Sequence, residues 1–323
     1  MPTQEHFTER ANALLNEKLF KTEDMFLGEF PRLQKQFREN FAQVCEEIIK
    51  LQKNEDFGDV AYIGYTMLRT NLINKEYVSE VCIYGENWYL GKNQRAVGRL
   101  DIAVLFKYFD ELWQELIAVR KNYVGKVSAQ EVTAFIMQEA APKFYSYVTV
   151  LGRFSILDCI GQNYFGEIKK SPRFEINSGE YMAQTEAVYK ENTEKDRAEI
   201  LSWFADRLEY EYCFEDFSGL DFSGEDFERI DCRYADFRNA VLKDTDFTYA
   251  NLIGARFCGA DLENADFSYA LIYEADFSGA NLKNANLEHA LSVDSENKKE
   301  DQKEAEWKRP RFMPVNFTGA IKD

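Results

Sequence analysis

The chain has 323 residues, of which 45% are hydrophobic, and its formal net charge is −17. This length leaves room for two domains, and the apolar content is ordinary for a folded protein. No stretch approaches about 18 uninterrupted apolar residues, and the start lacks a basic-then-apolar signal pattern, so we expect no membrane span and no secretion. The six cysteines are scattered without a Cys-x-x-Cys pair, which favours reduced thiols and a cytoplasmic location.

Residues 1–212 predict a mainly α-helical domain. Pro31 suits a first helical position, and the apolar residues after it keep one face for more than twenty residues, which predicts a helix over about 31–51. An apolar stripe predicts a second helix over about 100–120. The aromatic residues of this stripe are typical of a core rather than of a cofactor site.

The next helix signals are a capping box and a proline. Ser128 followed by Glu131 indicates the start of a third helix, and Pro142 the start of a fourth. Between these helices, residues 77–90 alternate β-branched and aromatic side chains around Gly-Glu-Asn, which predicts a β-hairpin. Trp88 and Tyr89 at its tip are candidate partner anchors if they are exposed.

Two further elements precede residue 213. The segment 171–180 is rich in Ser, Pro, Asn and Gly and predicts a loop. From about residue 193 a polar-to-apolar pattern predicts a helix that contains Ile200 and Phe204. This helix is well placed to cover the open end of the repeats that begin at residue 213.

From residue 213 onward a bulky apolar residue returns at every fifth position. From residue 235 on, the residue two positions before each centre is Ala except for Thr245, and the residue just before a centre is Asp or Asn in twelve of the fifteen units. A period of five is neither helical nor that of a strand, and it predicts a four-sided coil of twenty residues per turn. The centres are Phe217, Phe222, Phe227, Cys232, Phe237, Leu242, Phe247, Leu252, Phe257, Leu262, Phe267, Ile272, Phe277, Leu282 and Leu287.

These units resemble the pentapeptide-repeat family, which "ADFSYA", "ADFSGANLKNANLEHA" and "VNFTGA" match closely. The resemblance implies a right-handed quadrilateral β-helix over 213–323. The chain would then be a multidomain α + β protein, with a mainly helical N-terminal domain followed by this solenoid. The early units are looser, so we expect an irregular or partly covered first coil.

A charged segment, 292–306, interrupts the repeat. A solvated loop is the simpler interpretation, and a projecting loop that contacts a partner is the alternative. After it, Trp307, Phe312 and Phe317 are expected to resume the five-residue rhythm.

Residues 213–291 contain sixteen acids and six bases, a net charge of −10. Some relatives of the family imitate DNA and occupy type II topoisomerases such as gyrase, and Asp226, Asp246 and Asp266 would belong to such an acidic surface. Nine of the sixteen acids, however, occupy the consensus position that the fold itself favours. The balance favours a general protein-interaction surface over DNA mimicry, and a net acidic chain argues against direct nucleic-acid binding.

Few residues of the sequence suggest catalytic or metal-binding chemistry. Only two histidines exist, His6 and His289, so a histidine triad or a multi-histidine metal site is not expected. The sequence GENWYLGKN departs from a phosphate loop in its spacing. We therefore predict no catalytic, cofactor or metal residues, with an enzyme in the helical domain as the weakest alternative.

Apolar outward positions mark the candidate contact surface of the repeat. Ile253, Leu271 and Tyr273 replace polar residues in one column, and Tyr249 and Tyr269 are expected to stack at the adjoining corner. Three occupants stay open: the rest of the chain folded over the strip, an external protein partner, or a second copy of the chain. The favoured interpretation is a non-enzymatic protein–protein interaction or scaffold protein with a rigid acidic surface.

Overall fold

The computed structural model describes residues 3–91, 94–183, 185–207, 212–292, 307, 309–310 and 313–322. The chain divides into two compact units, each built from two stretches of sequence. Unit 1 comprises Met1–Tyr189 and Glu306–Pro310, and unit 2 comprises Lys190–Ala305 and Arg311–Asp323. The division therefore falls between Tyr189 and Lys190 rather than between residues 212 and 213.

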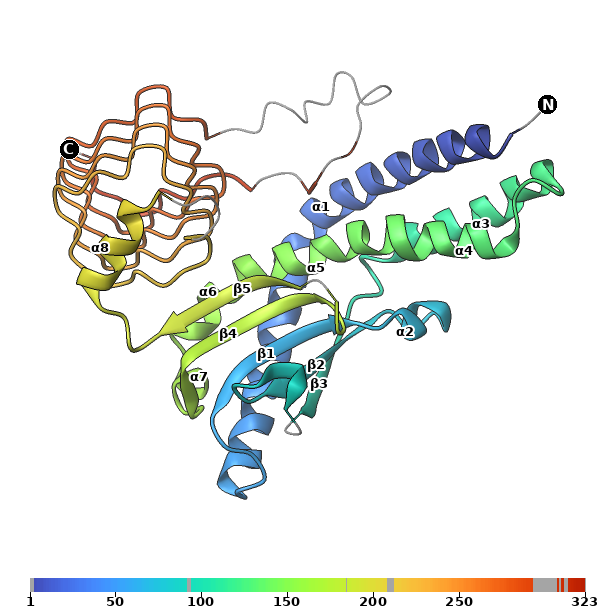
Figure 1. The fold of residues 1–323 in the computed structure, drawn as a ribbon, viewed down its shortest axis with the longest axis horizontal. Helices are drawn as coiled ribbons and strands as arrows, with labels where there is room; N and C mark the ends of the chain where they lie inside the picture. The colour runs from blue at the N-terminus through green and yellow to red at the C-terminus, as the bar shows by residue number, and fades with distance from the viewer. Residues whose placement is uncertain are drawn as a thin grey trace. The chain divides into compact units, whose positions relative to one another are not determined.

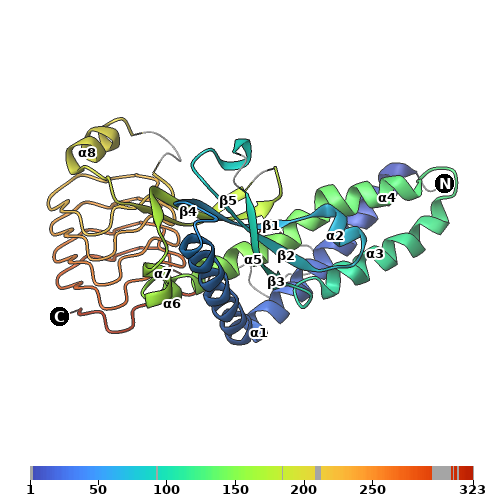
Figure 2. The ribbon, with the colours of Figure 1, turned by 90° about the horizontal axis from the view of Figure 1, so that it is seen from below.

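Unit 1 is built around one long helix. This helix, α1 (Gln4–Lys53), lies beside α3 (Lys107–Arg120) and α5 (Ala141–Ser155), as Figures 1 and 2 show. The shorter elements are α2 (Arg69–Ile73), η1 (Trp88–Leu90), η2 (Lys121–Tyr123), α4 (Ala129–Phe135), the π-helical turn η3 (Ile136–Ala140), α6 (Leu157–Ile160) and α7 (Asn163–Gly166).

The predicted start at Pro31 is wrong, because α1 runs through this residue. A proline inside a helix removes one hydrogen bond and costs about 3 kcal/mol or more. Pro31 lies on the exposed side of the helix, while Phe26 and Leu33 on either side of it are buried. Burial of about 1.5–3 kcal/mol for each such side chain offsets the proline and keeps the helix continuous.

Two predicted helix starts in unit 1 are confirmed. Ser128 accepts a hydrogen bond from the backbone of Glu131, whose side chain accepts one from the backbone N–H of Ser128, and α4 follows this capping box. Pro142 occupies the first turn of α5. Of the stripe over 100–120, only residues 107–120 are helical in α3, and Leu100 belongs to a strand.

A five-stranded sheet completes unit 1, where the sequence predicted a single hairpin. Its strands are β1 (Val60–Met67), β2 (Val78–Tyr84), β3 (Arg95–Asp101), β4 (Lys170–Glu180) and β5 (Thr185–Asn192), in the order β3-β2-β1-β4-β5. β1 pairs antiparallel with β2 and parallel with β4, while β2 pairs antiparallel with β3. The predicted second strand of the hairpin is instead the 3-10 turn η1, and the chain returns in β3.

One face of the sheet packs on the helices. Ile63, Tyr65 and Met67 of β1 are buried in the same core as the apolar faces of α1 and α5. The Tyr65 ring stacks on Phe37 of α1 with centroids 5.2 Å apart, and the Tyr145 hydroxyl of α5 donates to the carbonyl of Tyr65 at 3.1 Å. Every second side chain of β1 therefore faces the helices, as expected for a strand whose successive side chains point to opposite faces of the sheet.

The predicted loop 171–180 is wrong, because this segment forms β4. Its turn-rich start lies in a bulge: Val60 pairs with Lys170, and Tyr62 already pairs with Glu175. A bulge tolerates Pro172, which cannot donate a ladder hydrogen bond. The prediction of a loop relied on composition, and composition does not show which backbone groups are hydrogen-bonded to a neighbouring strand.

Unit 2 contains a stack of coils, formed by residues 212–292 and 313–322 and called here the coil stack (Figure 1). Fourteen parallel β-bridges join its turns, beginning with Asp216 to Asp236 and Asp221 to Val241. Each bridge up to Leu271–Leu291 spans twenty residues, and four bridge columns run along the stack. The predicted twenty-residue turn with four sides is confirmed.

The interior of the coil stack consists of the repeat centres and the small residues before them. Phe257 stacks between Phe237 and Phe277 at centroid distances of 5.2 and 4.9 Å, with the rings nearly parallel. Ala255 and Ala260 on either side are buried. Thr245, the exception to alanine, is also buried, and its hydroxyl donates to the carbonyl of Phe222 at 3.1 Å.

The helix predicted after residue 193 is confirmed as α8 (Arg197–Ala205), which belongs to unit 2. Phe204 lies in the coil core, with its ring 4.9 Å from that of Phe217 and 4.8 Å from that of Phe227. Outside the helix, Lys195 forms an ion pair with Asp216. The first coil, which lacks alanine at its inward positions, is thus covered by α8 and the segment before it.

The structure describes the coil stack up to Ser292 and again from residue 313. The bridge partner of Asp276 is Asn316, forty residues on instead of twenty, and Phe317 stacks on Phe277 at 5.3 Å. The predicted loop 292–306 lies outside the described residues except for Ser292, as does Phe312.

The prediction that Trp307 resumes the rhythm is wrong. This residue is buried in the core of unit 1, and its indole Nε1 donates to the hydroxyl of Tyr147 at 3.2 Å. The site in unit 1 offers a hydrogen-bond partner for the indole as well as burial. Spacing alone could not distinguish this core from the core of the coils.

In the part of the chain that the structure describes, no helix has an apolar stretch long enough to cross a bilayer.

Candidate interaction surface

The corners of the coil stack have a backbone conformation that restricts side chains. In the regular coils, the residue two positions after each centre has a positive φ, between 55° and 71°. Asn, Asp and Gly adopt this left-handed region readily, whereas other L-residues lose about 1–2 kcal/mol. The residue types at the four corners therefore show where the backbone preference decides and where it is overridden.

Two corners follow the backbone preference. The first corner holds only Gly and Asn, at positions 219, 239, 259 and 279, and the second only Gly, Asp and Asn, at positions 224, 244, 264 and 284. At the second corner the side chains form a ladder, in which Asn264 donates to Asp244 at 2.9 Å and Asn284 donates to Asn264 at 3.1 Å. The residue types at these two corners therefore follow from the backbone conformation of the fold alone.

The fourth corner overrides the preference for a structural reason. Tyr234 stacks on Phe214 at 5.0 Å and donates its hydroxyl to Glu274, two coils away, at 3.0 Å. Between them Gly254 leaves the space that the ring crosses, since an added Cβ would lie 2.2 Å from the ring. Glu274 also accepts a hydrogen bond from the backbone N–H of Met313 at 2.9 Å, so this corner fixes the re-entering chain.

The third corner overrides the preference without such an anchor. It holds Arg229, Tyr249, Tyr269 and His289, called here the tyrosine ladder. The Tyr249 and Tyr269 rings stack at 5.0 Å, Tyr269 and His289 stack at 4.8 Å, and the guanidinium of Arg229 lies 5.2 Å from the Tyr249 centroid. Tyr249 is 50% exposed and Tyr269 46% exposed.

In the tyrosine ladder the gain from stacking is of the same size as the cost of the backbone conformation. An aromatic pair contributes about 0.5–1.5 kcal/mol beyond burial, while each left-handed Tyr costs about 1–2 kcal/mol relative to the conformations it prefers. Among the described residues, the aromatic and cation–π contacts of Tyr249 and Tyr269 are with members of the ladder. We therefore regard this column as the main candidate for contact with another molecule.

Asp226, Asp246 and Asp266 form the acidic column of the face that leads into the ladder. Each accepts a hydrogen bond from the backbone N–H two residues later, an Asx-turn that stabilises the corner. Asp226 also pairs with Arg207 at 3.2 Å. Asp246 and Asp266 have no basic partner within the described ranges, although Asn286 donates weakly to Asp266 at 3.4 Å.

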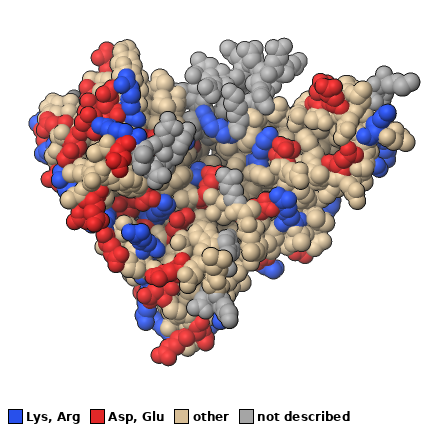
Figure 3. All heavy atoms as spheres, in the orientation of Figure 1, with Lys and Arg blue, Asp and Glu red and all other residues tan. Residues whose placement is uncertain are grey.

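Elsewhere in the coil stack many consensus acids are neutralised. Asp231 pairs with Arg233, Asp236 with Arg238, and Asp261 with Lys243, all within 3.2 Å. On the face seen in Figure 3, acidic and basic side chains are interspersed over the coils. Asp221 and Asp276, in two other columns, likewise have no ion pair among the described residues, so Asp246 and Asp266 are singled out by their position beside the ladder and not by their unpaired charge.

The predicted apolar strip lies on the other side of the ladder, along the fourth face. Ile253, Leu271 and Tyr273 are each partly exposed. Leu291, the bridge partner of Leu271, is 50% exposed and extends the strip. The acidic column, the tyrosine ladder and the apolar strip thus follow one another around the coil.

The other predicted anchors lie in unit 1. Trp88 is partly buried, with its ring 4.1 Å from Tyr62 and stacked 6.1 Å from Tyr84. It therefore covers the sheet face that the helices leave open. The side chain of Tyr89 lies outside the described residues.

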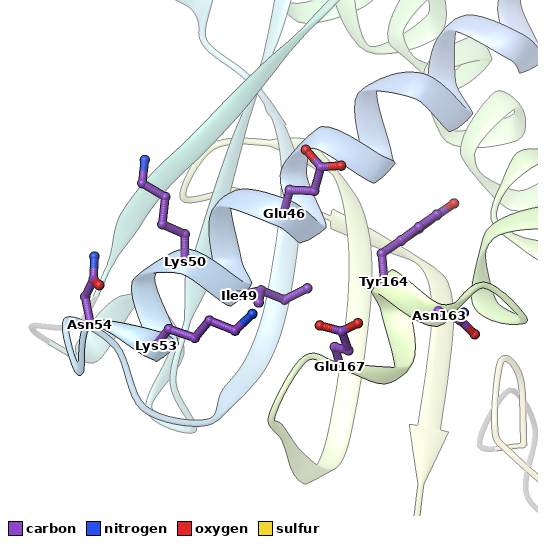
Figure 4. Close-up of a pocket in the computed structure, with 8 residues that line it drawn as sticks. All are labelled: Glu46, Ile49, Lys50, Lys53, Asn54, Asn163, Tyr164 and Glu167. Atoms are coloured by element: carbon purple, nitrogen blue, oxygen red, sulfur yellow. The ribbon is translucent and has the colours of Figure 1, made fainter.

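Unit 1 has a cavity of about 570 Å³ between the end of α1 and α7 (Figure 4). Lys53 and Glu167 point toward the space between the two helices, whereas Lys50 and Asn54 point away from α7. Its charged residues are of both signs, so the cavity does not select one ligand charge. The remaining lining residues are Glu46, Ile49, Asn163 and Tyr164.

A smaller cavity, about 230 Å³, lies between α5 and the ends of β4 and β5. Its hydroxyls bond to one another or to the backbone, as Thr149 donates to Ser178 at 3.0 Å. Its acids are paired, Glu180 with Arg69 and Glu186 with Arg153. Neither cavity includes a histidine among its lining residues.

Within the described ranges, few side chains are suited to metal binding or to thiol chemistry. No group of three His, Cys, Asp or Glu side chains there could hold a metal ion. Burial raises the pKa of the thiols of Cys213 and Cys258 to about 11, and that of Cys159 likewise to about 11. These cysteines are therefore protonated at neutral pH and poorly nucleophilic.

The comparisons with known proteins concern the coil stack. Residues 226–264 and 260–290 match the family model of pentapeptide repeats, in eight copies. The C-terminal region is therefore a pentapeptide-repeat region, and no family model matches the N-terminal domain. Among proteins with curated descriptions none matches the chain.

Several solved structures are similar to the repeat region. A pentapeptide repeat protein from the cyanobacterium Cyanothece 51142, Rfr23, is 25% identical over 34% of this chain and 58% of its own, with a TM-score of 0.24. HetL from Nostoc sp. strain PCC 7120 is 25% identical over 32% of this chain and 56% of its own, with a TM-score of 0.23. QnrB1, a plasmid-mediated fluoroquinolone resistance protein, is 18% identical over 33% and 60%, with a TM-score of 0.16. This chain spans less than two thirds of each.

Sequence reasoning named the two tyrosines of the ladder but missed Arg229 and His289. Both lie at the same twenty-residue spacing, which was the signal that could have found them. It also missed that all four residues have positive φ. Gly and Asn at the equivalent positions of the first two corners could have indicated this conformation.

Proposed function

We propose that the protein is a non-enzymatic protein–protein interaction or scaffold protein and that its coil stack provides the contact surface. The supporting observation is the exposed tyrosine ladder, which lies between an acidic column and an apolar strip. Aromatic residues next to partly exposed apolar groups are typical of interfaces. The backbone of the coils is held by bridges at every turn, so binding would require little ordering of the surface.

The architecture behind this proposal is a right-handed quadrilateral β-helix. The parallel bridges twenty residues apart and the four bridge columns support it, together with the family match over 226–290. The handedness is the expectation that the family resemblance brings.

Affinity capture from a native lysate tests the proposal. The tagged full chain would be compared with the double variant Ile253→Glu/Tyr273→Glu, which places two charges in the apolar strip. We expect the wild-type chain to retain a specific protein and the variant to lose it, while circular dichroism and thermal unfolding stay unchanged. No specific protein retained by the wild-type chain, in low or high salt, contradicts the proposal.

The identity of the captured protein decides between two kinds of partner. Topoisomerase subunits that dissociate as salt rises would favour modulation of gyrase by DNA mimicry, with Asp226, Asp246 and Asp266 at the contact. A different protein that survives high salt would favour a scaffold that binds through its apolar and aromatic residues. A cytoplasmic location and the capacity for self-association belong to the same proposal.

A further inference from the structure

The cavity between the end of α1 and α7 is lined by charged side chains that no neighbour neutralises. Lys53 of α1 and Glu167, at the C-cap of α7, both point into the space between the two helices (Figure 4). Glu46 lies two turns before Lys53 on α1 and lines the same cavity. None of these three side chains forms an ion pair or a hydrogen bond with another residue in the described ranges, whereas Lys50 points away from α7 and pairs with Glu47 at 3.2 Å.

An apolar surface lies between these charged groups. Ile49 of α1 and Tyr164 of α7 pack against the core of unit 1 and are partly exposed toward the cavity. In Figure 4 the Ile49 side chain extends from α1 toward α7. The volume of about 570 Å³ is within the range of about 300–1,000 Å³ that is typical of small-molecule sites. A matching ligand therefore combines an apolar part with charged groups of both signs.

We infer that this cavity binds an α-amino acid with an apolar side chain. Lys53 pairs with the carboxylate of the ligand, and Glu167 and Glu46 pair with its ammonium group. A simple anion would meet two carboxylates and a simple cation would meet Lys53, whereas a zwitterion offers each charged group a partner of opposite sign. The inference goes beyond the proposed function, which concerns unit 2, and does not depend on it.

The structure offers two informative variants and a matched control. Lys53 and Glu167 are exposed, so Lys53→Gln and Glu167→Gln should leave thermal unfolding unchanged. Lys50→Gln is the control, because it removes a positive charge from the same turn of α1 that points away from the cavity.

The test is ligand-observed saturation-transfer NMR of the full chain with L-leucine and two of its analogues. Isocaproate is leucine without its amino group, and isoamylamine is leucine without its carboxylate. We expect leucine to bind about fivefold more tightly than either analogue, because each analogue lacks one partly exposed ion pair.

The variants should remove these two preferences one at a time. Lys53→Gln should weaken leucine binding about fivefold and leave isoamylamine, which has no carboxylate, unchanged. Glu167→Gln should weaken leucine binding and leave isocaproate, which has no ammonium group, unchanged or slightly tighter. Lys50→Gln should leave the binding of all three molecules unchanged.

Three results would overturn the inference: no binding of leucine, equal binding of leucine and both analogues, or equal losses in Lys50→Gln and Lys53→Gln. A lower unfolding temperature of both Lys53→Gln and Glu167→Gln, with leucine binding unchanged, would also overturn it and would indicate that the two side chains pair with each other. The lysate capture tests the coil stack separately, so failure of this inference and failure of the proposed function are distinguishable.

Discussion

The two units of this chain obtain their cores in opposite ways. In the coil stack Phe257 contacts residues twenty positions before and after it, so one short pattern determines every contact. In unit 1 the contacts join distant segments: the amide of Gln52 bonds to the backbone of Lys169, and Lys18 pairs with Glu115. A repeat thus encodes its neighbours in the sequence itself, whereas unit 1 depends on pairings that no local pattern reveals.

Truncating a stacked ring should give the largest effect and confine it to the coils. Phe257→Ala removes a fully buried side chain and should destabilise the coil stack by about 3–5 kcal/mol, because the cavity lies between two coils that support each other. Hydrogen exchange should rise throughout residues 213–291. Phe144→Ala in α5 is the matched control and should raise exchange in unit 1 instead. Equal effects of both changes on both units would contradict the claim that each change destabilises only the unit that contains it.

Trp307 tests the comparison from the other side, because it follows the repeats in sequence but belongs to unit 1. Trp307→Ala should destabilise unit 1 by about 3–5 kcal/mol, measured as faster exchange in α1 and α5. Trp307→Phe keeps a ring against Tyr147 and loses the indole N–H, which should cost only about 1 kcal/mol. A rise in exchange that is limited to the coils would contradict the assignment of Trp307.

Gly254 tests how closely the fourth corner is packed. Gly254→Ala places a methyl group against the Tyr234 ring and should cost about 1–3 kcal/mol from overpacking, together with weakening the Tyr234–Glu274 hydrogen bond. Gly279→Ala has the same positive φ with nothing within 4 Å of the added carbon, so it should cost only about 1 kcal/mol. Urea denaturation of the two variants gives the difference, and equal midpoints would contradict the packing argument.

The smallest effect concerns acid. The hydroxyl and backbone N–H of Ser223 lower the pKa of Asp221, and the backbone N–H of Glu228 lowers that of Asp226. A lowered folded-state pKa gives stability that is present above the unfolded value of about 3.9 and is lost as the pH falls through the folded value. The coil stack should therefore unfold at lower urea concentration at pH 3 than at pH 6. Asp221→Asn should reduce this difference, and an unchanged difference would rule out a contribution from this carboxylate.

The sequence predicted the twenty-residue turn of the coil stack because the centres recur in register, as do the small residues from Ala235 on. The same reasoning placed Tyr249 and Tyr269 twenty residues apart on one corner, and their stacking follows from that spacing. It did not anticipate the positive φ of the corner, since a period of five gives the position of a turn but not its dihedral angles.

Unit 1 was predicted only where the signal is local. The capping box at Ser128 and the proline at 142 depend on neighbouring residues, and the structure has both. The parallel pairing of β1 with β4 joins segments more than a hundred residues apart, and nothing within 171–180 indicates it. Trp307 was misplaced because its spacing fitted the repeat while the more favourable environment lay in the other core.

The most direct test of the account is hydrogen–deuterium exchange of the full chain, alone and in complex with the protein that it captures. We predict that binding protects the corner segments 246–249 and 266–269 and leaves the sheet and helices of residues 3–189 unchanged. Protection limited to residues 3–189, with none in the coil stack, would contradict the claim that the coils provide the contact surface.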